Sequence, residues 1–414
     1  MTLAQMAPWA RGTPPQLVAL CARNVESLVA AELLAIEGVR NVATTPGAVF
    51  FSGDQATMYR ANMYLRCASR VLRVLQDVPC DAPDELYTEV RKFPWELYLG
   101  VKGTLAVNAS GEAPGLRNSM FTALRTKDGV VDRFREKFGG RPDVDIEQPD
   151  VRINVQLYKR HGKSRALFAL DSSDPALQKR GYRQQPGNAP MKETLAAAIV
   201  RMATEPIFHA SPSGEAVHTF PFVRPTFASK IPIVDLCCGS GTLLIEAGQL
   251  ALRRAPGLGR KFAFSRWKDF DPVLWTSIQA EAKETARICT EPFLYGADLD
   301  AVAVAGARNN LAAAGLASAS RVIQSDLRDL GKPPGEPGIV LCNPPYGQRM
   351  DYGIDLAALY RAIGDTLKRH FAGYRAYIFT GNLEMTREFG LRASARHVFW
   401  NGAIEGRLLC FDLY

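Results

Sequence analysis

The stretch Ile231–Ala247 has the sequence IPIVDLCCGSGTLLIEA and joins an apolar segment to a helical pattern through a glycine-rich turn. Its first six residues are mostly apolar or β-branched and predict a short buried strand that ends near Asp235. Glycines allow a ligand to approach the backbone closely, and the first turn of the following helix offers free N–H groups. We therefore expect a ligand cradle at this turn, with Asp235, Gly239, Ser240 and Gly241 as binding residues.

The ligand is predicted to be a nucleoside cofactor without a phosphate chain. A dinucleotide fingerprint needs a third glycine where this chain has Leu244, and a P-loop needs a Lys-Ser/Thr pair that is missing. Asp298, at the end of the run 293–298, could accept hydrogen bonds from ribose hydroxyls. Asp326, after the run 321–323, could accept one from an adenine amino group. Each acid alone is better explained as a helix cap or turn residue, but the order of the segments favours the cofactor.

A second chemical signal follows the apolar run 339–342, where Asn343, Pro344, Pro345 and Tyr346 stand in sequence. The prolines end the predicted strand and stiffen the backbone. An amide oxygen, a carbonyl and an aromatic ring are then held at the carboxyl end of a strand, where open α/β sheets bind ligands. The Asn343 and Pro344 oxygens could accept hydrogen bonds from a planar amino group, and Tyr346 could stack on the ring that carries it. The alternative is an ordinary turn with a surface tyrosine.

The order of predicted elements divides the chain into two kinds of fold. Strand and helix patterns alternate from residue 233 onward, which predicts a doubly wound parallel sheet. The tail segments His397–Asn401 and Arg407–Leu413 are expected to form a hairpin that closes this sheet. Before residue 172 the pattern is mixed and suggests small α+β units, with a helix near Asn24–Glu37 that Asn24 would cap.

The complete series of motifs resembles the class I S-adenosylmethionine-dependent methyltransferases that act on amino groups. Arg180-Gly181-Tyr182-Arg183 and the segment Ala189–Ala198 resemble the hinge of THUMP-containing RNA methyltransferases, and residues 17–75 and 104–171 are similar to that group. The resemblance extends from about Leu17 to Tyr414 and is greatest to the bacterial guanine-N2 methyltransferases of large-subunit ribosomal RNA. It implies a flexible N-terminus (1–16), a ferredoxin-like region (17–58), a THUMP domain (59–171), a linker (172–188) and a Rossmann-like class I methyltransferase domain (189–414).

The resemblance also implies the activity. S-adenosylmethionine would be the cofactor, Thr194 would help to bind it, and the N2 amino group of a guanine in 23S-type ribosomal RNA would be methylated. Some members carry a second methyltransferase domain, and this chain ends at Tyr414 without a second glycine-rich loop, so only the first activity is expected. Residues 205–230 look inserted, and the first sixteen residues match nothing.

Charge favours a polyanionic partner. The formal net charge is +8, with an excess of basic residues before residue 190. We expect RNA contacts at a predicted hairpin tip and at the hinge, from Lys159, Arg160, Lys163, Arg165, Arg180 and Arg183. A solvated cationic face is the alternative.

Composition limits the remaining classes. The chain has 8 Cys without a C-x-x-C pair and 5 His without ligand spacing, so no metal is expected. There is no apolar run of membrane-spanning length and no secretory signal, and a reducing cytoplasm is the expected location.

Other functions remain open at this stage. The amino-group motif would also suit adenine-N6 or protein-glutamine methylation, and the RNA substrate could be a transfer RNA. A non-catalytic RNA-binding assembly factor would keep the fold and lose the site, whereas this chain has all of its predicted site residues. Gln348 and Arg349 would either contact the base edge or a phosphate, or form part of a surface loop.

Overall fold

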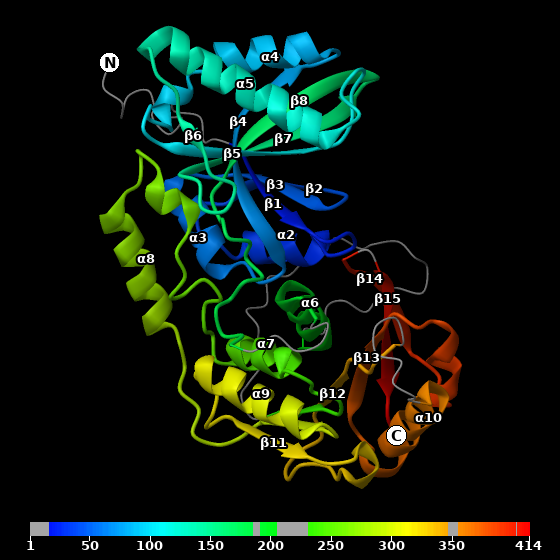
Figure 1. Cartoon of the computed structure of the whole chain (residues 1–414). Coiled ribbons are helices and arrows are strands. Elements are labelled where there is room, and N and C mark those ends of the chain that lie inside the picture. The colour runs from blue at the N-terminus through cyan, green and yellow to red at the C-terminus, as the bar shows by residue number, and fades with distance from the viewer. Residues whose placement is uncertain (1–15, 185–190, 205–230, 347–354, 403) are drawn as a thin grey trace.

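The computed structural model describes residues 16–184, 191–204, 231–346, 355–402 and 404–414. These residues build two β-sheets, one of eight strands and one of seven. Figure 1 shows the eight-stranded sheet in the upper half of the molecule and the seven-stranded sheet in the lower half. The predicted inserted segment 205–230, most of the predicted flexible N-terminus, and Gln348 and Arg349 lie outside the described residues.

The upper sheet has the strand order β2-β3-β1-β4-β8-β7-β5-β6. Its first part contains β1 (Gln16–Cys21), α2 (Glu26–Leu34), β2 (Arg40–Thr45), β3 (Ala48–Ser52), α3 (Gln55–Tyr64) and β4 (Ala68–Pro79). Its second part contains α4 (Pro83–Lys92), η2 (Trp95–Leu97), β5 (Thr104–Ser110), α5 (Ser119–Phe138), β6 (Asp143–Val144), β7 (Val151–Arg160) and β8 (Lys163–Asp171). Strand β4 pairs with both β1 and β8, so one continuous sheet joins the two parts.

The lower sheet has the order β11-β10-β9-β12-β13-β15-β14. Its strands are β9 (Ile233–Asp235), β10 (Leu294–Asp298), β11 (Ser320–Gln324), β12 (Ile339–Cys342), β13 (Arg375–Thr380), β14 (Ala395–Asn401) and β15 (Ile404–Asp412). Strands β9 to β13 are parallel, and the β14–β15 hairpin pairs with β13 through the antiparallel β15. The predicted doubly wound domain and its closing hairpin are confirmed.

Helices cover both faces of the lower sheet. They are α6 (Glu193–Thr204), α7 (Thr242–Ala251), α9 (Ala301–Ala313), η5 (Leu327–Asp329), α10 (Leu356–His370) and η6 (Glu384–Phe389). The elements η4 (Ala263–Arg266) and α8 (Pro272–Glu284) lie instead against the upper unit, where Phe264 and Trp275 contact the ring of Tyr59 in α3. Within β9, Ile233 belongs to the core that contains Leu244 of α7, whereas Val234 packs in the core that contains Ile363 and Leu367 of α10. Neighbouring residues of a strand point to opposite faces, so Ile233 and Val234 each bury an apolar side chain on one face of the sheet.

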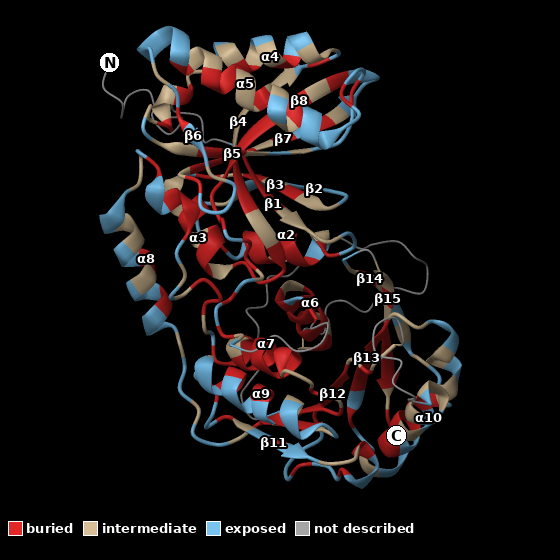
Figure 2. Cartoon of the chain, in the orientation of Figure 1, coloured by how far each residue is buried: buried red, intermediate tan, exposed pale blue. Residues whose placement is uncertain are grey.

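Buried charges join the upper unit to the lower unit. Glu32 of α2 accepts a hydrogen bond from the backbone N–H of Arg66 at 3.0 Å and forms an ion pair with Arg201 of α6 at 3.0 Å. Arg180 forms an ion pair with Glu246 of α7 at 3.4 Å. Figure 2 shows that α6 and α7, which lie at this junction, are largely buried. Removing one member of a buried ion pair costs about 3–5 kcal/mol, so these contacts hold the two units in a fixed orientation.

The role of Asn24 differs from its prediction, and one predicted domain border lies within a helix. Asn24 does not cap the first helix: it has a φ of 67°, Val25 precedes the helix instead, and the Asn24 side chain donates to the carbonyl of Val398 in β14 at 3.2 Å. This contact crosses between the two units and was not visible in the local sequence. The predicted border between residues 58 and 59 falls inside the continuous helix α3.

Candidate active site

Three predicted polar residues lie at the carboxyl edge of neighbouring strands. Asp235 ends β9, Asp298 ends β10, and Asn343 directly follows β12. Strand β9 lies between β10 and β12, and the chain order reverses on either side of it. Such a reversal opens a crevice outside the strand ends, where α/β sheets bind ligands. The tertiary structure therefore brings the cofactor and amino-group motifs to one edge.

The glycine-rich loop has the backbone that its sequence predicts. Gly239 and Gly241 have φ values of 51° and 79°, a region that glycine adopts without steric cost. The Gly239 N–H donates to the Asp298 carboxylate at 2.8 Å. A Cβ on Gly241 would lie 3.3 Å from the Cβ of Ala307, whereas a Cβ on Gly239 would have no atom within 4 Å apart from its chain neighbours. Gly241 thus allows α9 to pack closely, and Gly239 leaves its side of the loop open to a ligand.

Asp235 is only 1% exposed and accepts a hydrogen bond from the Cys237 N–H at 3.3 Å. Burial raises the pKa of Asp235 to about 8, and repulsion by Asp298 adds to the shift. A positive charge placed beside this carboxyl group would favour its ionised form.

The two remaining cofactor candidates lie near the loop or at the next strand. Thr194 is half-buried in the first turn of α6. Asp326 follows β11 and caps η5 through the Arg328 N–H, and its carboxylate also binds the Arg328 guanidinium at 2.6 Å. The hydrogen bonds from Arg328 lower the pKa of Asp326. Asp326 therefore has the local capping role that a single acid most often has, and a contact with adenine would share its carboxylate with Arg328.

The amino-group motif is held rigidly at the end of β12. The Asn343 Oδ1 atom is buried and has no hydrogen-bond partner among the described residues. Pro344 is buried, and Tyr346 is half-buried. The Tyr346 ring lies against the backbone after β13, since a Cβ on Gly381 would approach it to 3.0 Å. A buried acceptor without a donor is unusual, and a substrate amino group would satisfy it.

Sequence reasoning missed the residues that support this motif. The Tyr360 hydroxyl, on α10, bonds the Thr380 hydroxyl at 2.6 Å and lies 3.4 Å from the Pro345 carbonyl. Asn401, at the end of β14, donates to the Tyr346 hydroxyl at 3.1 Å. These partners are 15 to 55 residues away from the motif, and no local pattern marks them.

The structure corrects the predicted role of Arg180 and gives Arg183 and Arg165 protein partners. Arg180 is buried and forms an ion pair with Glu246, so its guanidinium cannot reach RNA. The Arg183 side chain is 16% exposed and binds within the protein beside the cofactor loop. Arg165 is engaged by Asp77, at 2.9 Å from the carboxylate. A guanidinium carries five donors, and nearby carboxylates, carbonyls and hydroxyls of the protein accept hydrogen bonds from these three arginines.

The other predicted basic residues remain at the surface. Lys159 and Arg160 end β7 and Lys163 begins β8, so all three lie at the tip of the predicted hairpin, and all are exposed. Within the described ranges none of the three forms an ion pair. Figure 1 places this hairpin in the upper unit, whereas β12 and its amino-group motif lie in the lower unit.

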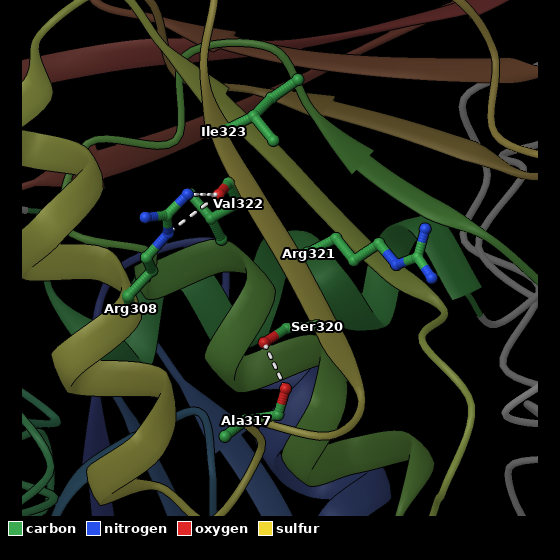
Figure 3. Close-up of a pocket in the computed structure, with 6 residues that line it drawn as sticks. All are labelled: Arg308, Ala317, Ser320, Arg321, Val322 and Ile323. Carbon is green, nitrogen blue, oxygen red and sulfur yellow. Dashed lines mark hydrogen bonds between the residues drawn. The ribbon is translucent and has the colours of Figure 1, made fainter.

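A separate hollow of about 420 Å³ lies along the outer edge of β11. Figure 3 shows Arg308 of α9 reaching the carbonyl of Val322, and its Nε and Nη2 atoms donate to this oxygen at 2.9 and 2.6 Å. The guanidinium thereby covers an edge carbonyl that has no strand partner on that side. None of the predicted site residues lines this hollow.

Two features are absent from the described residues. No group of three or more His, Cys, Asp or Glu side chains there could hold a metal ion. No described helix combines the length and apolar character needed to cross a bilayer.

Family models match three parts of the chain. Residues 16–72 match the RlmL ferredoxin-like domain, residues 81–161 match the THUMP domain, and residues 227–409 match the RMKL-like methyltransferase domain. Together with the strand order and the glycine-rich loop, these matches define a class I S-adenosylmethionine-dependent methyltransferase joined to a THUMP-containing N-terminal unit.

Known proteins resemble this chain over nearly its whole length. It is 36% identical to a candidate RNA methyltransferase of Synechocystis sp., over 96% of both chains. It is 38% identical to the ribosomal RNA large subunit methyltransferase K/L of Syntrophotalea carbinolica, over 97% of this chain and 54% of that protein. The crystal structure of a candidate methyltransferase complexed with SAH has a TM-score of 0.81 and 29% identity, and covers 97% of this chain and 99% of its own.

The chain belongs to the S-adenosylmethionine-dependent RNA methyltransferases, the family of its Synechocystis relative. It spans about half the length of the K/L relatives that it matches. The residues present fit this cofactor: a Cβ on Gly239 would have no atom within 4 Å apart from its chain neighbours, and the Asp298 carboxylate, which accepts from the Gly239 N–H, would be the acceptor for ribose hydroxyls.

Proposed function

We propose that this protein methylates the exocyclic N2 amino group of a guanine in large-subunit ribosomal RNA. The observation that carries the proposal is the buried Oδ1 atom of Asn343 at this edge of the sheet, which has no hydrogen-bond partner among the described residues. The names of the K/L relatives support large-subunit RNA as the substrate. The choice of guanine N2 rests on the family resemblance, because the motif itself would accept any planar amino group.

The residues of the motif would position the amine by two hydrogen bonds and one stacking contact. Oδ1 of Asn343 and the carbonyl of Pro344 would each accept a hydrogen bond from the amino group, which directs its lone pair away from the base ring. Tyr346 would stack on the base, with its ring fixed by Asn401 and by the backbone at Gly381. S-adenosylmethionine supplies an electrophilic methyl group when it is bound.

Proton transfer needs no strong base in this mechanism. A neutral aromatic amine is the nucleophile, and its nitrogen becomes acidic only after the methyl group has been added. The two acceptor oxygens hold its N–H bonds throughout, and the proton then leaves to water. Because a paired guanine cannot present this amino group to the sheet edge, the base has to be turned out of its helix.

RNA docking would involve both units of the protein. The exposed cations Lys159, Arg160 and Lys163 are placed to bind phosphates, which hold RNA without reading its sequence. Their position in the upper unit means that a bound RNA would extend from this hairpin to the catalytic edge.

The product identifies the function. The full chain would be incubated with methyl-labelled S-adenosylmethionine and either large-subunit ribosomal RNA or transfer RNA that lacks the modification, and the nucleosides would be analysed by mass spectrometry. We expect N2-methylguanosine in the ribosomal RNA and none with Asn343→Ala, whereas exposed Asn108→Ala on β5 should behave as the parent. N6-methyladenosine, or labelling of transfer RNA alone, would refute the proposal.

A further inference from the structure

Arg183 connects the segment between the two units to the cofactor loop. Its Nη1 atom donates to the Ser240 hydroxyl at 3.0 Å, and its Nη2 atom donates to the Thr242 hydroxyl at 3.1 Å. The Nε atom forms an ion pair with Glu193 at 3.0 Å, and Nη2 also donates to the Met191 carbonyl at 3.2 Å. One guanidinium thus holds the loop, the start of α7 and the start of α6 together.

Asn310 of α9 makes a second connection to the same loop. Its Nδ2 atom donates to the Ser240 carbonyl at 3.0 Å, and its Oδ1 atom accepts from the Gln184 N–H at 3.0 Å. The side chain is 1% exposed, so water does not compete for these bonds. Arg183 therefore holds the Ser240 hydroxyl directly, and Asn310 links the Ser240 carbonyl to the backbone of Gln184.

The loop needs such support because its own backbone is permissive. Ser240 lies between Gly239 and Gly241, two residues that lose more conformational freedom on ordering than any others. Asp298 fixes the Gly239 N–H from one side, and Arg183 fixes Ser240 from the other. A loop that is ordered before binding holds its ligand more tightly than a mobile loop, because no conformational entropy is lost when the ligand binds.

We propose that Arg183, assisted by Asn310, is a positioning residue that preorganises the cofactor loop, so that affinity for S-adenosylmethionine depends on the segment that leads in from the RNA-docking unit. The four protein acceptors of Arg183 occupy its donors and keep it from phosphates. Arg183 acts through Ser240 and Thr242, and it takes no part in the methyl transfer. The proposal concerns cofactor binding alone and holds for any RNA substrate.

Calorimetric titration of S-adenosylmethionine and of S-adenosylhomocysteine into the full-length protein tests this role. Arg183→Met removes every bond from the guanidinium and should raise the Kd of both ligands by about tenfold or more, the equivalent of leaving one loop residue unordered. Arg183→Lys keeps a charge beside Glu193, but its single nitrogen cannot reach all four acceptors of the guanidinium, so its Kd should be intermediate. In steady-state assays the defect should appear in KM for S-adenosylmethionine, with kcat near the parent value.

Arg152→Met is the matched control. Arg152 forms an ion pair with Asp174 at 2.8 Å, its side chain is 10% exposed, and it donates to a backbone carbonyl as Arg183 does. It lies on β7, away from the loop, so Arg152→Met should lower Tm and leave the Kd unchanged. Parent-like affinity in Arg183→Met would overturn the proposal, as would equal weakening by the control. If Arg183→Met does not fold, a parent-like Kd in Arg183→Lys overturns it instead.

Discussion

Asn343→Ala is expected to move activity and stability in opposite directions. The Oδ1 atom of Asn343 is buried without a donor in the part of the chain that the structure describes, and an unsatisfied buried polar group costs about 1–3 kcal/mol. Removing the amide relieves part of this cost and loses no hydrogen bond through that oxygen. We therefore expect the Tm of the ligand-free variant to equal or exceed that of the parent by a degree or two, since each kcal/mol moves Tm by about 2–4 °C in mid-sized domains.

The effect on methyl transfer should be large. Loss of one preorganised transition-state acceptor typically lowers turnover by about 10²–10³-fold, which corresponds to roughly 2.7–4 kcal/mol. The cofactor site is formed by other residues, so the Kd for S-adenosylmethionine should remain at the parent value. Asn343→Asp keeps an oxygen acceptor and should be less impaired than Asn343→Ala.

Single-turnover transfer from labelled cofactor and thermal unfolding measure these two quantities on the same samples. Asn154→Ala is the matched control, because the Nδ2 atom of Asn154 on β7 is also buried without a partner in the described structure. Both variants should be as stable as the parent, and only Asn343→Ala should lose turnover. Turnover of Asn343→Ala within threefold of the parent would refute the role given to Asn343, and a fall in Tm by several degrees would show that its oxygen has a protein partner.

Three further outcomes follow from the charged residues. Asp235 has a pKa of about 8 when folded against a usual value near 3.8, so the folded state binds an extra proton between these values and stability falls as pH rises through this range. Asp235→Asn should therefore raise the ligand-free Tm more at about pH 9 than at about pH 5, and equal shifts at both would contradict the burial argument. Asp298→Ala should weaken S-adenosylmethionine binding in calorimetry, because the ribose hydroxyls and the Gly239 N–H both lose their acceptor. Reversing the charges of Lys159, Arg160 and Lys163 should weaken RNA binding for all sequences. The slope of log K for RNA binding against log salt concentration should become shallower by about 2–3, while the affinity for the cofactor serves as the internal control. An unchanged slope would mean that the hairpin does not contact phosphates.

Local sequence patterns were sufficient to predict those elements that depend on neighbouring residues alone. A buried strand, a glycine-rich turn and a helix follow from residues 231–247, since apolar pattern and glycine freedom act over neighbouring positions. The hairpin with Lys159 and Lys163 near its tip, and the strand that Asn343 follows, have the same local origin. The order of these elements was enough to predict a doubly wound sheet with its ligand edge.

The partners of the long polar side chains, by contrast, depend on how the whole chain packs. Arg180 and Arg183 are three residues apart in one segment and appeared equivalent, yet one is buried against Glu246 and the other holds Ser240. Asn24 had the sequence of a helix cap and instead joins the two units through Val398. These outcomes depend on which carboxylates, hydroxyls and carbonyls lie within reach after the sheets have packed. A donor at the end of a flexible side chain is satisfied by the folded neighbourhood, and residues far apart in the chain supply that neighbourhood.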